Sequence, residues 1–189
     1  MIFMVVATGR CGFHFLASLL ESTMKFEVVR EFDSSYVRES DRPIGWKVDL
    51  RTLDGALRCL SDRGTEPDRW IRLVRRDKLA QAKSQLRRRD AKRSIIRKHE
   101  REKLRAYRNI KFRLNDNEIS SMLSYTKAEE RELDRFVEDL NPHIIYYEDF
   151  IEPDTWPHAV GGILDFLGIP YEEPLHLSTD LVRLSEVNS

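Results

Sequence analysis

The sequence predicts an α/β protein in which helices flank a central parallel sheet in three layers. Short apolar runs rich in β-branched residues, the first at residues 2–7, indicate strands buried on both faces. Amphipathic helical patterns separate these runs, so strands and helices alternate along the chain. Ligands of such sheets bind at the carboxyl ends of the strands, so we expect the functional residues there.

The individual elements follow from local patterns. After the strand at 2–7, Phe13, Leu16, Ala17 and Leu20 recur at spacings of three and four, which predicts a helix. A second strand is predicted at 26–29, and residues 43–50 alternate as in a short strand or extended loop. The later predictions are a helix at 52–60, a strand at 70–74, a helix at 78–89, a strand at 143–147 and a helix over 160–167, stopped by Gly168 and Pro170.

Length and charge indicate one domain, residues 1–189, with a charged helical insertion at about 87–140. The net charge is zero, but residues 87–113 hold thirteen Lys or Arg against three Asp or Glu. Residues 114–154 hold twelve acidic residues against three basic ones. Sparse apolar residues at helical spacing predict two or more long, largely solvated helices. The acidic stretch can neutralise the basic one in a hairpin, so we expect no nucleic-acid partner, and pairing of these helices between chains makes a homodimer possible.

The two cysteines and the N-terminus bear on the cellular compartment. Cys11 and Cys59 are far apart and neither has a second Cys nearby, so we expect neither a disulfide framework nor a metal site. The apolar run at the N-terminus lacks a basic flank, and no run approaches the roughly 20 residues that span a bilayer. These features predict a cytoplasmic protein without a membrane span.

The loop at residues 8–14, Thr-Gly-Arg-Cys-Gly-Phe-His, has the P-loop-like layout of a phosphate cradle. A helix N-terminus offers free N–H groups and a partial positive charge, and glycine lets the backbone approach an anion. Arg10 adds a fixed charge with bidentate geometry. No Gly-Lys-Ser/Thr follows, so this is not a standard nucleoside triphosphate loop. The alternative is a tight strand-to-helix turn with a surface arginine.

A second candidate anion site follows the strand at 70–74. Arg76 stands at the end of this strand, and Ser84 follows eight residues later, just over two helical turns. Both side chains could therefore reach one anion. The alternative, an ordinary basic helix start, is favoured when this segment is considered alone.

The two loops together resemble the sulfotransferases that use 3'-phosphoadenosine 5'-phosphosulfate (PAPS). The phrase RLVRRDKLAQAKSQLR is most similar to the bacterial branch typified by the trehalose sulfotransferase family, and YYEDF and ILDFLGIP add to the likeness. The resemblance covers residues 2–90 and 143–173 and is weak across 90–140, where acceptor-binding segments differ most within the family.

The resemblance implies roles for individual residues. The first loop, Thr8, Gly9, Arg10, Cys11, Gly12, Phe13 and His14, would hold the 5'-phosphosulfate of PAPS, while Arg76 and Ser84 would grip its 3'-phosphate. Lys47, in a Gly-x-Lys phrase, would stabilise the transferring sulfuryl group together with Arg10. Glu31 matches the glutamate proposed as general base, with His14 as second choice. The acceptor would be a hydroxyl of a small molecule, carbohydrate or lipid, and no metal is required.

The first loop also departs from the family pattern. Relatives usually carry Ser or Thr at the positions of Cys11, Phe13 and His14. Phe13 can donate only through its backbone N–H, whereas His14 can donate from a ring nitrogen. Two alternatives remain open: a P-loop-type kinase of a small metabolite, which Mg dependence would reveal, and a catalytically altered helical adaptor that binds a partner through residues 87–140.

Overall fold

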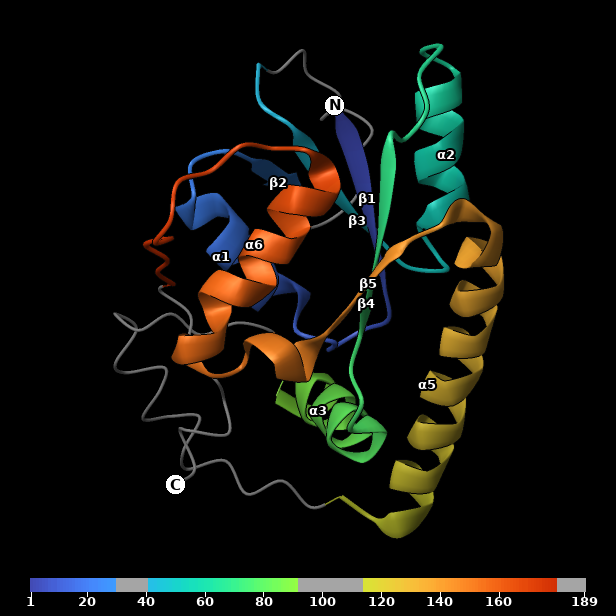
Figure 1. Cartoon of the computed structure of the whole chain (residues 1–189). Coiled ribbons are helices and arrows are strands. Elements are labelled where there is room, and N and C mark those ends of the chain that lie inside the picture. The colour runs from blue at the N-terminus through green and yellow to red at the C-terminus, as the bar shows by residue number, and fades with distance from the viewer. Residues whose placement is uncertain (30–40, 92–113, 180–189) are drawn as a thin grey trace.

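The computed structural model describes residues 1–29, 41–91 and 114–179, which form an α/β fold around a parallel sheet (Figure 1). Its five strands run in the order β2-β3-β1-β4-β5, and each neighbouring pair is parallel. The strands are β1 (Ile2–Ala7), β2 (Glu27–Val29), β3 (Ile44–Val48), β4 (Arg69–Val74) and β5 (His143–Tyr146). The described α-helices are α1 (Phe13–Ser22), α2 (Leu53–Ser61), α3 (Lys78–Ala91), α5 (Asp116–Val137) and α6 (Trp156–Leu167).

Helices cover both faces of the sheet, as the buried strand patterns predict. Phe3, Val5 and Ala7 of β1 pack in one core with α1 and α6. Met4 and Val6 point to the opposite face and pack in a second core with α2 and α5. This alternation follows from the two-residue period of a strand. The α/β class and the flanking helices are therefore confirmed, with α1 and α6 on one side of the sheet and α2 and α5 on the other (Figure 1).

A helix was predicted in the acidic stretch after residue 113, and the described part of this stretch is helical but is buried along one side. Residues 116–137 form the single helix α5, which lies along one face of the sheet (Figure 1). Its buried residues include Leu133 and Val137 in the second core, and also Thr126, Glu129 and Glu130. Because charged residues dominate this stretch, its sequence pattern did not indicate that one side of the helix packs on the sheet. Residues 92–113 of the expected insertion lie outside the described residues.

Helix α3 is placed at the carboxyl end of the sheet (Figure 1). The Asp77 Oδ1 atom accepts the Ala80 N–H at 2.8 Å, so Asp77 caps the first turn, as its position before the helix predicts. Ala82 and Leu86 of α3 are buried. The cap and the two buried residues set the orientation of α3, and with it the side of the helix that faces the loop after β1. None of the helices within the described ranges is long and apolar enough to cross a membrane.

Candidate functional site

The loop after β1 makes a sharp, close-packed turn into α1. Arg10 and Gly12 both have left-handed backbones, with φ values of 61° and 94°. A Cβ atom on Gly12 would lie 2.1 Å from Cδ2 of Tyr147, so the ring of Tyr147 requires glycine at this position. The conformation and the packing together explain the glycine that the sequence places just before the helix.

Two side chains of this loop belong to the core. Cys11 is 1% exposed and Phe13 is 2% exposed, and both pack in the core shared by α1 and α6. Burial raises the pKa of the Cys11 thiol, which keeps it neutral. Any contact of these two residues with a ligand would therefore come from their backbone. His14 is half-buried in the first turn of α1.

Two glutamines of α3 hold the first loop in place. Gln81 Nε2 donates to Thr8 Oγ1 at 2.7 Å and to the Gly9 carbonyl at 2.8 Å. Gln85 Nε2 donates to the same carbonyl at 3.0 Å. These two glutamines were not predicted as site residues. Their spacing of four places both side chains on the same side of a helix that follows a strand, and this pattern could have indicated them.

The two predicted anion-binding segments meet through their side chains. Arg10 Nε donates a hydrogen bond to Ser84 Oγ at 3.0 Å. Arg75, just after β4, approaches from the other side, where its Nη1 donates to the Arg10 carbonyl at 3.4 Å. The Arg75 guanidinium lies over the Tyr147 ring, 4.7 Å from its centroid. Two guanidinium groups and one hydroxyl thus converge around the loop between β1 and α1.

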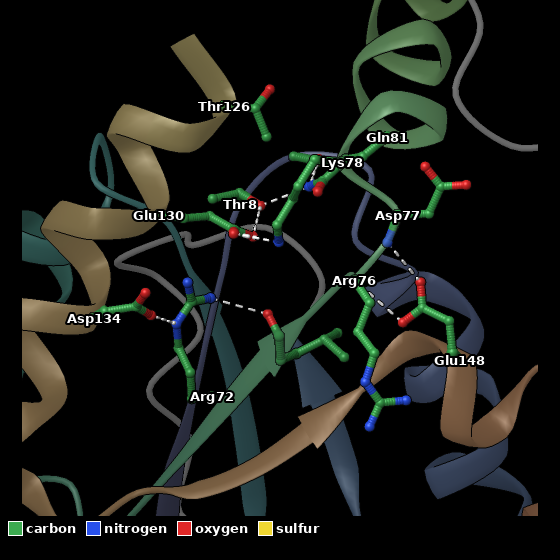
Figure 2. A network of polar contacts seen from close by, with 12 residues as sticks. Thr8, Arg72, Arg76, Asp77, Lys78, Gln81, Thr126, Glu130, Asp134 and Glu148 are labelled. Atoms are coloured by element: carbon green, nitrogen blue, oxygen red, sulfur yellow. Dashed lines mark hydrogen bonds and ion pairs between the residues drawn. The ribbon is translucent and has the colours of Figure 1, made fainter. Parts of the chain in front are cut away.

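Arg76 is directed elsewhere. Its guanidinium forms an ion pair with Asp149 at 2.8 Å and stacks on the Tyr146 ring, 3.8 Å from the centroid. Figure 2 shows this side chain pointing away from Thr8 and Lys78. The structure therefore brings Arg10 and Ser84 together but leaves Arg76 outside their contact. A carboxylate that follows β5 is thus paired with an arginine that follows β4.

Glu148 organises the turn between β4 and α3. Its carboxylate accepts the Arg76 N–H at 3.0 Å and the Asp77 N–H at 3.1 Å. Desolvation opposes ionisation of this group, but the Arg76 and Asp77 N–H donors, the Glu148 N–H and the charge of Arg75 together outweigh it, so the pKa of Glu148 is lowered. Glu148 thus stays ionised and holds the N-terminus of α3 against the end of β5.

On the α5 side of the loop, charged side chains form two neighbouring sets of polar contacts (Figure 2). The Glu130 carboxylate accepts the Thr8 hydroxyl at 3.4 Å and pairs with the Lys78 ammonium. Arg72, only 1% exposed in the middle of β4, donates to Asp134 of α5 at 2.9 Å and to the Val6 and Leu73 carbonyls. These contacts anchor α5 to the strand that leads into the first loop.

Lys47 lies at the end of β3, beside β1. Its ammonium pairs with Asp49 at 3.6 Å, and Arg51 and Thr52 also bond the Asp49 carboxylate. Burial opposes the charge of Asp49, but Lys47, Arg51 and Thr52 together hold its pKa below the usual value. Lys47 stands opposite Val5 of β1 in the sheet register, so it lies beside the strand that leads into the first loop. Glu31, the predicted base, lies outside the described residues.

The described ranges contain no group of His, Cys, Asp and Glu side chains suited to holding a metal ion. What this edge of the sheet does offer is Arg10 and Arg75 at a glycine-bearing turn before a helix N-terminus. Two further cations stand on neighbouring elements, Lys78 paired with Glu130 and Lys47 paired with Asp49. Comparison of the sequence with protein-family models and with curated proteins gives no match.

Proposed function

We propose that this chain is a PAPS-dependent sulfotransferase that transfers a sulfuryl group to the hydroxyl of a small molecule, carbohydrate or lipid. The observation that carries the proposal is the contact between Arg10 and Ser84, 3.0 Å from Nε to Oγ. It joins the two segments to which the family resemblance assigns the donor's phosphates. Segments 74 residues apart in the chain thereby form one cationic, hydrogen-bonding edge.

Residue roles in this proposal follow from position. The loop over residues 8–14 acts as a P-loop-like cradle, in which the backbone of Cys11 and Phe13 replaces the hydroxyls of relatives. Arg10 and Lys47 offset charge on the sulfuryl oxygens and on the departing phosphate, because such transfers depend mainly on positioning and electrostatic stabilisation. Ser84 binds the 3'-phosphate. Arg75 bonds the Arg10 carbonyl of the same loop, and its positive charge stabilises the bound anion.

Arg76 requires a rearrangement in this proposal. Its partner Asp149 is half-exposed, so the pair is weak and an arriving phosphate can replace it. Swinging Arg76 from Asp149 towards Ser84 would bring both residues of the Arg-x7-Ser pattern to one phosphate. The donor therefore competes with Asp149 for the same guanidinium.

Calorimetric titration with adenosine 3',5'-bisphosphate, the product of the donor, tests this function. We expect micromolar affinity for the bisphosphate and at least tenfold weaker binding of AMP and ATP. Arg76→Ala should remove most of the preference for the 3'-phosphate, whereas Arg69→Ala, an exposed arginine at the start of β4, should leave it unchanged. Equal binding of AMP and the bisphosphate would contradict the proposal.

A further inference from the structure

Two adjacent arginines follow β4, and their side chains have different surroundings. Arg75 Nη1 donates to the Arg10 carbonyl at 3.4 Å, so this guanidinium lies against the first loop. Arg76 instead pairs with Asp149 at 2.8 Å, and Figure 2 shows it pointing away from Thr8. Successive side chains at the end of a strand point to opposite sides, which explains the separation. The two positive charges are therefore presented to different parts of this edge.

The ring of Tyr147 holds Arg75 in its place. The Arg75 guanidinium lies 4.7 Å from the ring centroid, close enough for a cation–π interaction. The same ring packs so closely against the loop that a Cβ atom on Gly12 would lie 2.1 Å from its Cδ2 atom. It also meets the buried Phe150 ring edge to face, with the centroids 5.6 Å apart. Tyr147 thus connects the hydrophobic core to the turn of the loop and to one guanidinium.

The backbone between the two arginines is also fixed. The Glu148 carboxylate accepts the Arg76 N–H at 3.0 Å and the Asp77 N–H at 3.1 Å. The Arg76 guanidinium stacks on the Tyr146 ring, 3.8 Å from its centroid. Residues 146–149, at the end of β5 and just after it, therefore hold both arginines, each by a different aromatic ring. An exchange of the two side chains would require these contacts to break.

Arg75 keeps hydrogen-bonding capacity for a ligand. Its Nε atom is buried, and no residue of the described ranges accepts this N–H. A buried donor without a partner is unfavourable, and an anion bound at the loop would remove that cost. The loop leads directly into α1, whose N-terminal N–H groups and partial positive charge favour the same anion. Groups that suit an anion thus meet at this turn.

We propose that the two arginines divide the donor between them: Arg75 binds the 5'-phosphosulfate and Arg76 binds the 3'-phosphate. Tyr147 is then a positioning residue, which acts on the donor only through Arg75 and the loop. The proposal rests on the proposed sulfotransferase function. It follows from the partners of the two side chains, because Arg75 contacts the loop to which the phosphosulfate is assigned, whereas the printed partners of Arg76 lie within residues 146–149.

Matched variants of the neighbouring arginines test this division. We would compare Arg75→Gln and Arg75→Lys with Arg76→Gln, and use Arg69→Gln, an exposed arginine of the same strand, as control. Each protein is titrated calorimetrically with adenosine 3',5'-bisphosphate, with 3'-AMP and with 5'-AMP. The ³¹P NMR spectrum of the bound bisphosphate resolves its 3'- and 5'-phosphates, so it shows which phosphate each substitution affects.

The loss of affinity should follow the phosphate that each arginine binds. Arg75→Gln should weaken the bisphosphate and 5'-AMP by about 10–100-fold, as expected for a lost bond to a charged group, and leave 3'-AMP within about twofold. Arg76→Gln should show the reverse pattern. Arg75→Lys keeps the charge but loses the planar fork, so its affinity should fall between those of the wild type and Arg75→Gln. The ³¹P signal of the 5'-phosphate should move in Arg75→Gln, and that of the 3'-phosphate in Arg76→Gln.

Tyr147 needs its own comparison, because a change there can also disturb folding. Tyr147→Leu removes the aromatic face and Tyr147→Phe keeps it, while Tyr125→Leu, at an exposed tyrosine of α5, is the control. Tyr147→Leu should lose affinity for 5'-AMP and the bisphosphate, whereas unchanged binding of 3'-AMP would show that the protein is folded. Tyr147→Phe should bind all three nucleotides like the wild type, since its ring still faces Arg75.

The opposing results are distinct. Arg75→Gln that binds every nucleotide like the wild type, or that weakens 3'-AMP as much as 5'-AMP, overturns the inference. So does equal movement of both ³¹P signals in this variant, although donor binding then still stands. An equal loss of all three nucleotides in Tyr147→Leu would leave Tyr147 with a structural role alone and overturn its positioning role. Failure of the wild type to bind the bisphosphate overturns the proposed function itself.

Discussion

Arg10 donates its Nε–H to Ser84 Oγ at 3.0 Å and so connects the turn after β1 to the second turn of α3. Both residues are partly buried, and Gln81 and Gln85 reinforce the same junction by bonding the Gly9 carbonyl. This pair helps to fix the direction of the Arg10 side chain. In the proposed function, the phosphate of the donor would meet a guanidinium already oriented and a hydroxyl already ordered.

Ser84→Ala should weaken the binding of adenosine 3',5'-bisphosphate about tenfold, since a hydrogen bond to a charged group contributes about 1.5–3 kcal/mol and part of it persists through water. Calorimetric titration measures the change. Ser61→Ala, at the exposed end of α2, is the control and should bind like the wild type. Unchanged affinity in Ser84→Ala would remove this hydroxyl from the proposed site.

Gly12→Ala should lower the free energy of unfolding by at least about 3 kcal/mol, because it combines backbone strain with overlap of the Tyr147 ring. Gly64→Ala is a matched control: its φ is 66°, and a Cβ there meets nothing within 4 Å, so only strain of about 1–2 kcal/mol is expected. Urea unfolding measures both. Equal losses in the two variants would show that the Tyr147 contact carries no cost.

Glu129→Gln should increase stability at neutral pH. A carboxyl whose pKa is raised in the folded protein favours folding when protonated, and this contribution is lost as the pH rises through the raised pKa. The neutral amide avoids that loss, so the free energy of unfolding of the variant should exceed that of the wild type at pH 7. The difference should vanish below the ordinary glutamate pKa of about 4.3. Thermal unfolding across this pH range measures it.

Asp49→Asn should change the stability at pH 7 in the opposite direction from Glu129→Gln. The pKa of Asp49 is lowered in the folded protein, so its ionised form favours folding above the ordinary aspartate pKa and the benefit is lost as the pH falls. The variant should be less stable than the wild type at pH 7, and the two should converge in acid. If both variants shifted stability in the same direction at pH 7, the assigned environments of the two carboxyl groups would be wrong.

Asp134→Asn should destabilise the protein by about 1–2 kcal/mol, because it removes the carboxylate bonded to the buried Arg72 guanidinium. The loss stays below that of a fully buried pair, since the Asp134 side chain is 59% exposed. Glu132→Gln, on the same helix and exposed, should change stability by less than about 0.5 kcal/mol. Urea unfolding of both variants measures the difference; equal stabilities would show that Arg72 does not depend on Asp134.

Local sequence patterns were sufficient for the strands, for their alternation with helices, and for the edge that carries the site. The apolar run at residues 2–7 became β1, and the glycine-bearing loop led into α1 at Phe13, as predicted. Parallel strands place their carboxyl ends at one edge, so the loops that follow β1 and β4 were expected at that edge.

Side-chain directions at this edge could not be read in the same way. Arg76 was expected to face the anion, but Asp149 and the Tyr146 ring hold it elsewhere, because β5 lies beside β4 and brings a carboxylate 73 residues away in the chain. Arg75 instead contacts the first loop. Two adjacent arginines look equivalent in the sequence, and only the neighbours from another strand distinguish them.

The α5 side of the site was missed for a related reason. Glu129 and Glu130 stand in an acidic helical stretch whose pattern is also that of a solvated helix. Their burial depends on which face of α5 meets the sheet. Leu133, Val137 and the Arg72–Asp134 bond together set that orientation of the helix.

The sequence by itself thus determined the class of fold, the order of its elements and the presence of a cationic, glycine-bearing turn, because these depend on periodicity and composition within a few residues. Only the tertiary structure decided that Arg10 bonds Ser84, that Arg76 turns to Asp149 and that Glu129 is a buried residue of α5. Those outcomes depend on competition among groups far apart in the chain, where distance and desolvation set the energies.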